Sequence, residues 1–139
     1  MSRGFVVDAS VALTWCFQAD ATPASLRLLD RLVDERITVP AWWMLELANS
    51  MRAGERRGLV SAVELERFVR MIEGMDIEFD SEAHQRAFAD YVPLARAHRV
   101  TVYSAMYLEL ALRRRLALAT LDEELRRAAA EAGVDLLGV

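Results

Sequence analysis

The 139-residue sequence contains no lysine, one cysteine, two histidines and three prolines. A single cysteine excludes an intrachain disulfide, and its place between Trp15 and Phe17 indicates a small core residue rather than a reactive thiol. No apolar run approaches the roughly 18–20 residues of a membrane-spanning helix. The first residues also lack the apolar stretch and cleavage site of a signal peptide. These absences favour a reducing cytoplasm and argue against a membrane partner.

All seventeen basic residues are arginines, against twenty-one acidic residues, which gives a net charge of −4. Coding bias explains the missing lysines more simply than a selection of arginine for binding phosphates. The net charge does not indicate nucleic-acid binding, but it does not exclude it, because binding depends on the local arrangement of charge on the surface. A chain of this length with 54% apolar residues is typical of one globular domain, expected to cover residues 1–139.

Short apolar runs alternate with amphipathic segments along the whole chain. Strands are expected at 5–7, 37–39, 75–79, 116–120 and 134–137. Helices are expected to begin at Ser10, Thr22, Ser61, Ser104 and Asp122, with others over 46–57 and 81–98, the last kinked or broken by Pro93. This alternation predicts an α/β fold whose central, mostly parallel sheet is flanked by helices on both faces.

Three acidic residues lie at or shortly after the carboxyl ends of expected strands: Asp8, Glu46 and Asp122. Ligand sites of parallel sheets form at that edge. Converging carboxylates repel one another unless a cation holds them, and Mg²⁺ or Mn²⁺ suits such oxygen ligands. Asp8 and Asp122 also fit simple helix caps, and Glu46 fits a partly solvated helix position. Spacing alone therefore supports only a weak metal-site hypothesis.

Four segments together resemble the PIN domains of VapC-type toxins. They are residues 6–11 (VVDASV), 40–49 (PAWWMLELAN), 103–111 (YSAMYLELA) and 116–122 (LALATLD). The resemblance implies a PIN-like fold and a Mg²⁺- or Mn²⁺-dependent endoribonuclease. It also implies a homodimer that is neutralised by a small VapB-like antitoxin. In this family Asp8, Glu46 and Asp122 would be the metal-binding acids, supported by Ser10 and by Asn49.

The third segment departs from the family pattern, because Ser104 stands where an aspartate is usual. Ser104 can keep the expected helix N-cap, so the fold should survive. The site would lose one negative charge, and its affinity for a divalent ion should fall. Glu109 lies five residues further along the helix and points in another direction, so it is not expected to substitute.

Three explanations for Ser104 remain open from the sequence. The chain is a nuclease that works with three acids and water, a weakened relative that still binds an antitoxin or RNA, or a form in which the serine was substituted to tolerate a toxic protein. No Cys–His or Ser–His pair suggests a covalent nucleophile instead.

Arginines and tryptophans supply the remaining candidates. Arg52 and Arg56 fit either contacts to RNA or antitoxin or a solvated helix face, whereas residues 113–115 better fit a helix C-terminus. Trp42 and Trp43 are adjacent, so one is expected in the core and the other at a groove or interface. The apolar positions 63, 65, 68, 69 and 72 fit either the core or a contact between protomers. The two histidines are expected to be structural or exposed.

Overall fold

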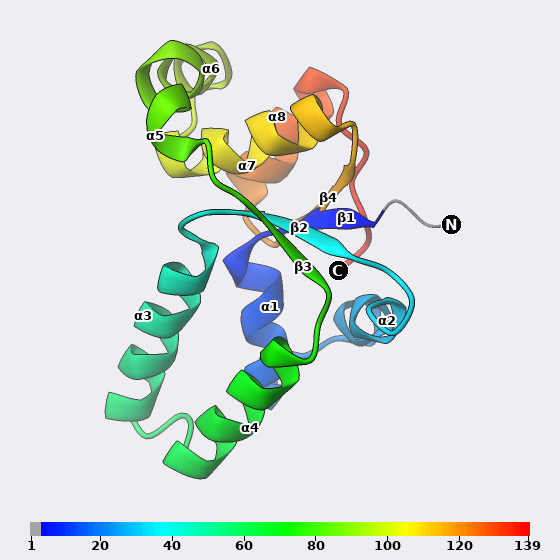
Figure 1. The fold of residues 1–139 in the computed structure, drawn as a ribbon, viewed down its shortest axis with the longest axis vertical. Helices are drawn as coiled ribbons and strands as arrows, with labels where there is room; N and C mark the ends of the chain where they lie inside the picture. Colours follow the sequence, from blue (N-terminus) through cyan, green and yellow to red (C-terminus); the bar gives the residue numbers. More distant parts are fainter. Residues whose placement is uncertain (1–3) are drawn as a thin grey trace.

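The computed structural model describes residues 4–139 and has a central four-stranded sheet (Figure 1). The strands are β1 (Phe5–Val7), β2 (Ile37–Pro40), β3 (Ile77–Asp80) and β4 (Ala117–Ala119), arranged in the order β3-β2-β1-β4. Every pair is parallel. The predicted mostly parallel sheet is confirmed, and in these residues it is parallel throughout.

Burial explains the composition of the strands. The central strands β1 and β2 are buried at every position, as expected for parallel strands covered on both faces. The edge strand β3 instead exposes Phe79 and carries charged Glu78 and Asp80. The two central strands therefore anchor the core, and β3 brings charge to one edge of the sheet.

Helices cover both faces of the sheet, as predicted. On one side lie α1 (Ala9–Cys16), the short η1 (Gln18–Asp20), α2 (Pro23–Arg31), α3 (Trp43–Arg56) and α4 (Ala62–Glu73). On the other lie α5 (Ala83–Arg86), the π-helical η2 (Ala87–Tyr91), α6 (Val92–His98), α7 (Val102–Arg114) and α8 (Glu123–Ala132) (Figure 1). None of the helices in residues 4–139 is long and apolar enough to cross a membrane.

Several expected details of the helices are confirmed. Thr22 and Ser61 both form capping boxes, and Asp122 caps α8. Trp43 is fully buried whereas Trp42 is 50% exposed, and Cys16 lies in the core. Of the apolar positions in α4, Phe68 and Ile72 join the core while the side chains at 63 and 69 stay exposed.

Two predicted N-caps are wrong. The cap of α1 is Asp8, whose carboxylate accepts a hydrogen bond from the Val11 amide, and Ser10 already lies inside the helix. The cap of α7 is Thr101, whose hydroxyl accepts from the Ser104 amide, so that helix begins two residues before Ser104. In both cases an earlier residue with a suitable oxygen takes the cap.

Two other local expectations are corrected. Residues 134–137 form one isolated bridge, between Leu118 and Leu136, instead of a strand, because only a short stretch pairs with the edge of β4. The helical segment continues through Pro93 without a break, but it is not a regular α-helix. Pro93 lies in the first turn of α6, where a missing N–H is tolerated, and the π-helical η2 precedes it.

Candidate metal centre

The three predicted acids meet at the carboxyl edge of the sheet. Strand β1 has β2 on one side and β4 on the other, so the order of the strands reverses at β1. Parallel sheets open a crevice at the carboxyl ends of the strands beside such a reversal. Asp8 follows β1, Glu46 lies in the first turn of α3, and Asp122 follows β4. All three line one cavity of about 230 Å³, together with Ser10 and Ser104.

Asp8 is the most enclosed of these acids, with 5% of its surface exposed. Its Oδ1 accepts hydrogen bonds from Ser10 Oγ (2.6 Å) and from the Val11 amide (3.2 Å), and its Oδ2 accepts one from Thr120 Oγ1. Burial raises the pKa of Asp8; these hydrogen bonds oppose the rise, and the charge of Asp122 adds to it. The fold therefore holds a carboxylate in a place that disfavours its negative charge.

Glu46 is held by a residue that the sequence analysis did not single out. The Tyr107 hydroxyl donates a 2.6 Å hydrogen bond to Glu46 Oε1. Burial raises the pKa of Glu46, the bond from Tyr107 opposes this, and the charge of Asp8 adds to it. Tyr107 lies three residues after Ser104 on α7, and residues three apart on a helix share a face. This spacing is the sequence signal that could have placed Tyr107 at the site.

Asp122 combines the two roles considered for it. Its Oδ1 caps α8 by accepting from the amides of Glu124 (2.9 Å) and Leu125 (3.2 Å), while the side chain also lines the cavity. Buried Thr120 connects this acid to Asp8. Its hydroxyl donates to Asp8 and accepts a 3.0 Å bond from the Asp122 amide.

The supporting residues divide into two groups. Ser10 bonds to Asp8 and also accepts a 3.0 Å hydrogen bond from the Leu121 amide, and Ser104 lines the cavity as a neutral hydroxyl. Asn49 is exposed on α3 and does not line the cavity, so the structure does not bring it to the acids. Arg52 is also exposed outside the cavity and pairs with Glu55 at 2.9 Å.

Glu109 and the arginines at the end of α7 belong to a separate charged cluster. Arg113 pairs with Asp80 and Glu109 at 2.9 Å each, and Arg114 pairs with Glu78 at 2.9 Å. Glu109 therefore does not replace the missing aspartate. Arg113 and Arg114 are held by carboxylates of their own chain, which agrees with the structural role favoured for them.

The donor set of the cavity suits a hard divalent cation. Its lining contains three carboxylates and several hydroxyls but no basic residue. Among residues 4–139, however, no three His, Cys, Asp or Glu side chains are placed to hold one ion together. The charge of the cavity fits a cation, while its ligands as arranged do not complete a three-acid site.

Comparison with known proteins assigns the family. The sequence model of the PIN domain matches residues 5–131, and the chain belongs to the PIN domain family. The fold is similar to the crystal structure of PAE2754 from Pyrobaculum aerophilum, with a TM-score of 0.66 and 19% identity over 91% of this chain and 79% of that one. Curated protein sequences gave no significant match. PIN domains are generally metal-dependent nucleases that use divalent ions.

Replacing Tyr107 with phenylalanine is expected to weaken Mn²⁺ binding several-fold and to lower nuclease activity about tenfold, because Glu46 loses the donor that orients it. The measurement is the Mn²⁺ concentration that half-saturates both cleavage and the thermal shift of the protein. Tyr91→Phe is the matched control, since Tyr91 is equally buried but does not line the cavity. An unchanged Mn²⁺ requirement in Tyr107→Phe would show that Glu46 needs no positioning.

Proposed function

We propose that this protein is a Mg²⁺- or Mn²⁺-dependent endoribonuclease toxin of the VapC type, which hydrolyses RNA phosphodiester bonds. The observation that carries the proposal is the cavity in which Asp8, Glu46 and Asp122 meet without any basic residue. Burial raises the pKa of Asp8 and of Glu46, and the charge of Asp122 adds to the rise at Asp8 while the charge of Asp8 adds to the rise at Glu46. A bound divalent cation removes that cost, which is the physical reason to place one there.

In this proposal Asp8, Glu46 and Asp122 would move together to hold the ion. The chemistry that such an ion would supply is activation of water and neutralisation of charge on the phosphate. The other residues keep the acids in place: Tyr107 orients Glu46, and the Thr120 hydroxyl joins the two acids that follow β1 and β4. Helix α8 directs its first amides at the carboxylate of Asp122.

The biological setting follows from the motif resemblance. We propose a homodimer in the cytoplasm that is neutralised by a small VapB-like antitoxin, with RNA as the substrate. The four motif segments support this setting. Co-expression with the product of a small adjacent gene, followed by size-exclusion chromatography, tests it: a stable complex that suppresses cleavage is expected.

A second candidate is a PIN-fold protein that binds an antitoxin or RNA but cleaves poorly. Ser104 favours it, because a neutral hydroxyl lines the cavity where the family usually has an acid. The incomplete ligand arrangement within residues 4–139 points the same way. The two candidates share the fold and the binding surfaces and differ only in catalytic strength.

Cleavage of a structured RNA mixture in Mg²⁺ and in Mn²⁺ separates the candidates when the unaltered protein is compared with Ser104→Asp. The new carboxylate is expected to strengthen ion binding about tenfold and to increase cleavage, because it adds a charged ligand to the cavity. Ser104→Asn is the control of similar shape without charge. Cleavage by the unaltered protein that chelator abolishes supports the toxin. Cleavage only by Ser104→Asp supports the second candidate, and cleavage by neither contradicts the nuclease proposal.

A further inference from the structure

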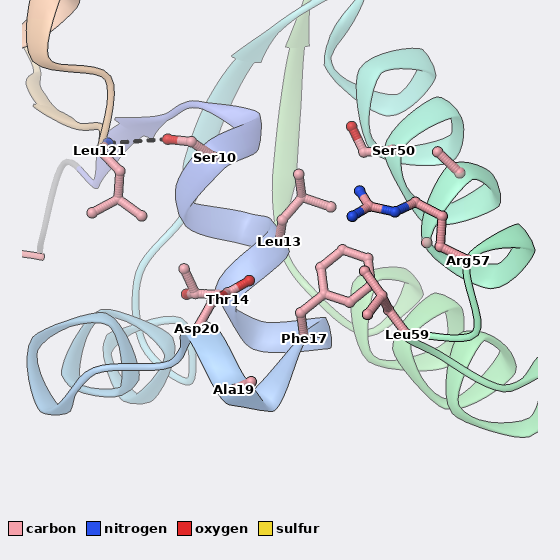
Figure 2. Close-up of a pocket in the computed structure, with 12 residues that line it drawn as sticks. Ser10, Leu13, Thr14, Phe17, Ala19, Asp20, Ser50, Arg57, Leu59 and Leu121 are labelled. Atoms are coloured by element: carbon pink, nitrogen blue, oxygen red, sulfur yellow. Dashed lines mark hydrogen bonds between the residues drawn. The ribbon is translucent and has the colours of Figure 1, made fainter.

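A second hollow adjoins the carboxylate cavity. It encloses about 780 Å³ between α1, η1 and the end of α3, and Ser10 lines both spaces (Figure 2). Figure 2 shows Ser10 bonded to Leu121 at one end of this groove and Phe17 with Leu59 toward the other. Ser10 lies beside the acids, and Phe17 lies seven residues further along, just after α1. The groove therefore begins next to the acids and extends about 10 Å away from them.

The groove differs from the cavity in its chemistry. Apolar side chains form much of its wall, among them Leu13, Phe17 and Leu59. Two charged residues complete the lining: Asp20 on η1 and Arg57 at the end of α3. Figure 2 shows the Arg57 guanidinium reaching from α3 toward Leu13, across from α1.

The residues that line the groove include one basic residue, Arg57, and those that line the carboxylate cavity include none. Arg57 makes no ion pair within residues 4–139, unlike Arg52, which is paired with Glu55. At about 100° per residue, Arg57 lies about 20° around the helix from Glu46, whereas Arg52 and Arg56 lie about 240° and about 280° around it. The arginine that shares the face of Glu46 is therefore Arg57, and not the two that the sequence analysis selected.

We propose that Arg57 binds a phosphate of the RNA strand further along the groove from the bond to be cut, while a flanking base rests against Phe17 and the neighbouring leucines. The inference rests on the proposed nuclease function and adds the path of the substrate. Sites that bind a single strand without sequence preference commonly combine a basic side chain for the phosphate with an aromatic ring on which a base stacks. The carboxylates of the cavity repel the phosphates that lie outside the proposed ion site, and a cation nearby adds attraction for the rest of the strand.

Binding of a fluorescein-labelled single-stranded RNA tests the proposal, measured by anisotropy in Mg²⁺ over a series of salt concentrations. The protein carries Asp8→Asn throughout, so that the RNA stays intact, and is compared with and without Arg57→Gln. Arg57→Gln is expected to weaken binding about three- to tenfold at low salt. The slope of log K against log salt concentration should become about 0.7 less negative, the change expected when one phosphate contact to a single strand is lost. Arg57→Lys should keep most of that salt dependence.

Arg56→Gln is the matched control, because Arg56 is exposed on the same helix but does not line the groove. Equal affinity and equal salt dependence in Arg57→Gln and Arg56→Gln would overturn the role of Arg57 and leave the nuclease proposal standing. Absence of RNA binding, together with absence of cleavage by the unaltered protein, would overturn both. A poly-glutamate peptide that binds at Arg57 in preference to RNA would assign the groove to an acidic polypeptide and overturn the inference.

Discussion

Replacing Asp8 with asparagine is expected to lower Mg²⁺-dependent RNA cleavage at least about a hundredfold while the protein remains folded. The amide side chain has nearly the same shape, and its oxygen can still accept from Ser10 and from the Val11 amide. Its NH₂ group can donate to the Thr120 hydroxyl, which has a second lone pair beside the one used by the Asp122 amide. The substitution thus removes charge and a metal ligand with little change in packing.

The same substitution should stabilise the metal-free protein at neutral pH. The pKa of Asp8 is raised in the folded state by burial, so its ionised form opposes folding. This cost is fully present above the folded pKa and disappears as the pH falls through it toward the unfolded value. Thermal unfolding with chelator should therefore show Asp8→Asn a few degrees above the unaltered protein near neutral pH, with a smaller difference in acid.

Asp30→Asn is the control, because Asp30 is exposed on α2 and lies outside the cavity. It should change neither cleavage nor the pH dependence of unfolding. Retained cleavage in Asp8→Asn would contradict the metal-centre assignment. A loss of stability in Asp8→Asn at neutral pH would contradict the electrostatic account of the cavity.

Replacing Arg113 with methionine is expected to lower the free energy of unfolding by about 3–5 kcal/mol, the typical cost of removing one partner of a buried ion pair. Arg113 is 19% exposed and bonds to both carboxylate oxygens of Asp80, whose side chain is 2% exposed. It also bonds to Glu109 and Glu82. These contacts join α7 to β3 and to the chain that follows it, and the substitution leaves the buried charge of Asp80 poorly compensated.

The pH dependence of this loss has a definite sign. Burial alone would raise the pKa of Asp80, but the hydrogen bonds and charge of Arg113 outweigh it and lower the pKa. A lowered pKa contributes stability that is present above the unfolded pKa and is lost as the pH falls through the folded value. The difference between the unaltered protein and Arg113→Met should therefore be largest near neutral pH and shrink in strong acid.

Urea unfolding measures the effect, with Arg36→Met as the matched control. Arg36 pairs with Asp76 at 3.1 Å, but both side chains are more than half exposed, so about 0–1 kcal/mol is expected. Adding Asp80→Asn to Arg113→Met should restore part of the lost stability, because it removes the uncompensated charge. Equal effects of Arg113→Met and Arg36→Met would show that the cluster behaves like an ordinary surface pair.

Local patterns explain why much of the fold was predictable. Residues 5–7 and 37–39 are short β-branched or aromatic runs, and a parallel sheet buries such runs on both faces. The acids that follow them had to lie at one edge, since parallel strands end together. The boundaries were less predictable, because Asp8 and Thr101 compete for caps with the serines that follow them.

The sequence by itself determined the α/β class and the edge at which Asp8, Glu46 and Asp122 meet, because these features depend on periodicity and on residue identity at the ends of strands. The expectation of an acid at Ser104 came only from the family resemblance. Only the tertiary structure decided that Tyr107 holds Glu46, that Thr120 links two acids and that Arg57 faces the groove. Those contacts join segments as many as 112 residues apart. Helical spacing places Tyr107 on the face of Ser104 and Arg57 on the face of Glu46, but the packing of helices on the sheet sets which side chains meet.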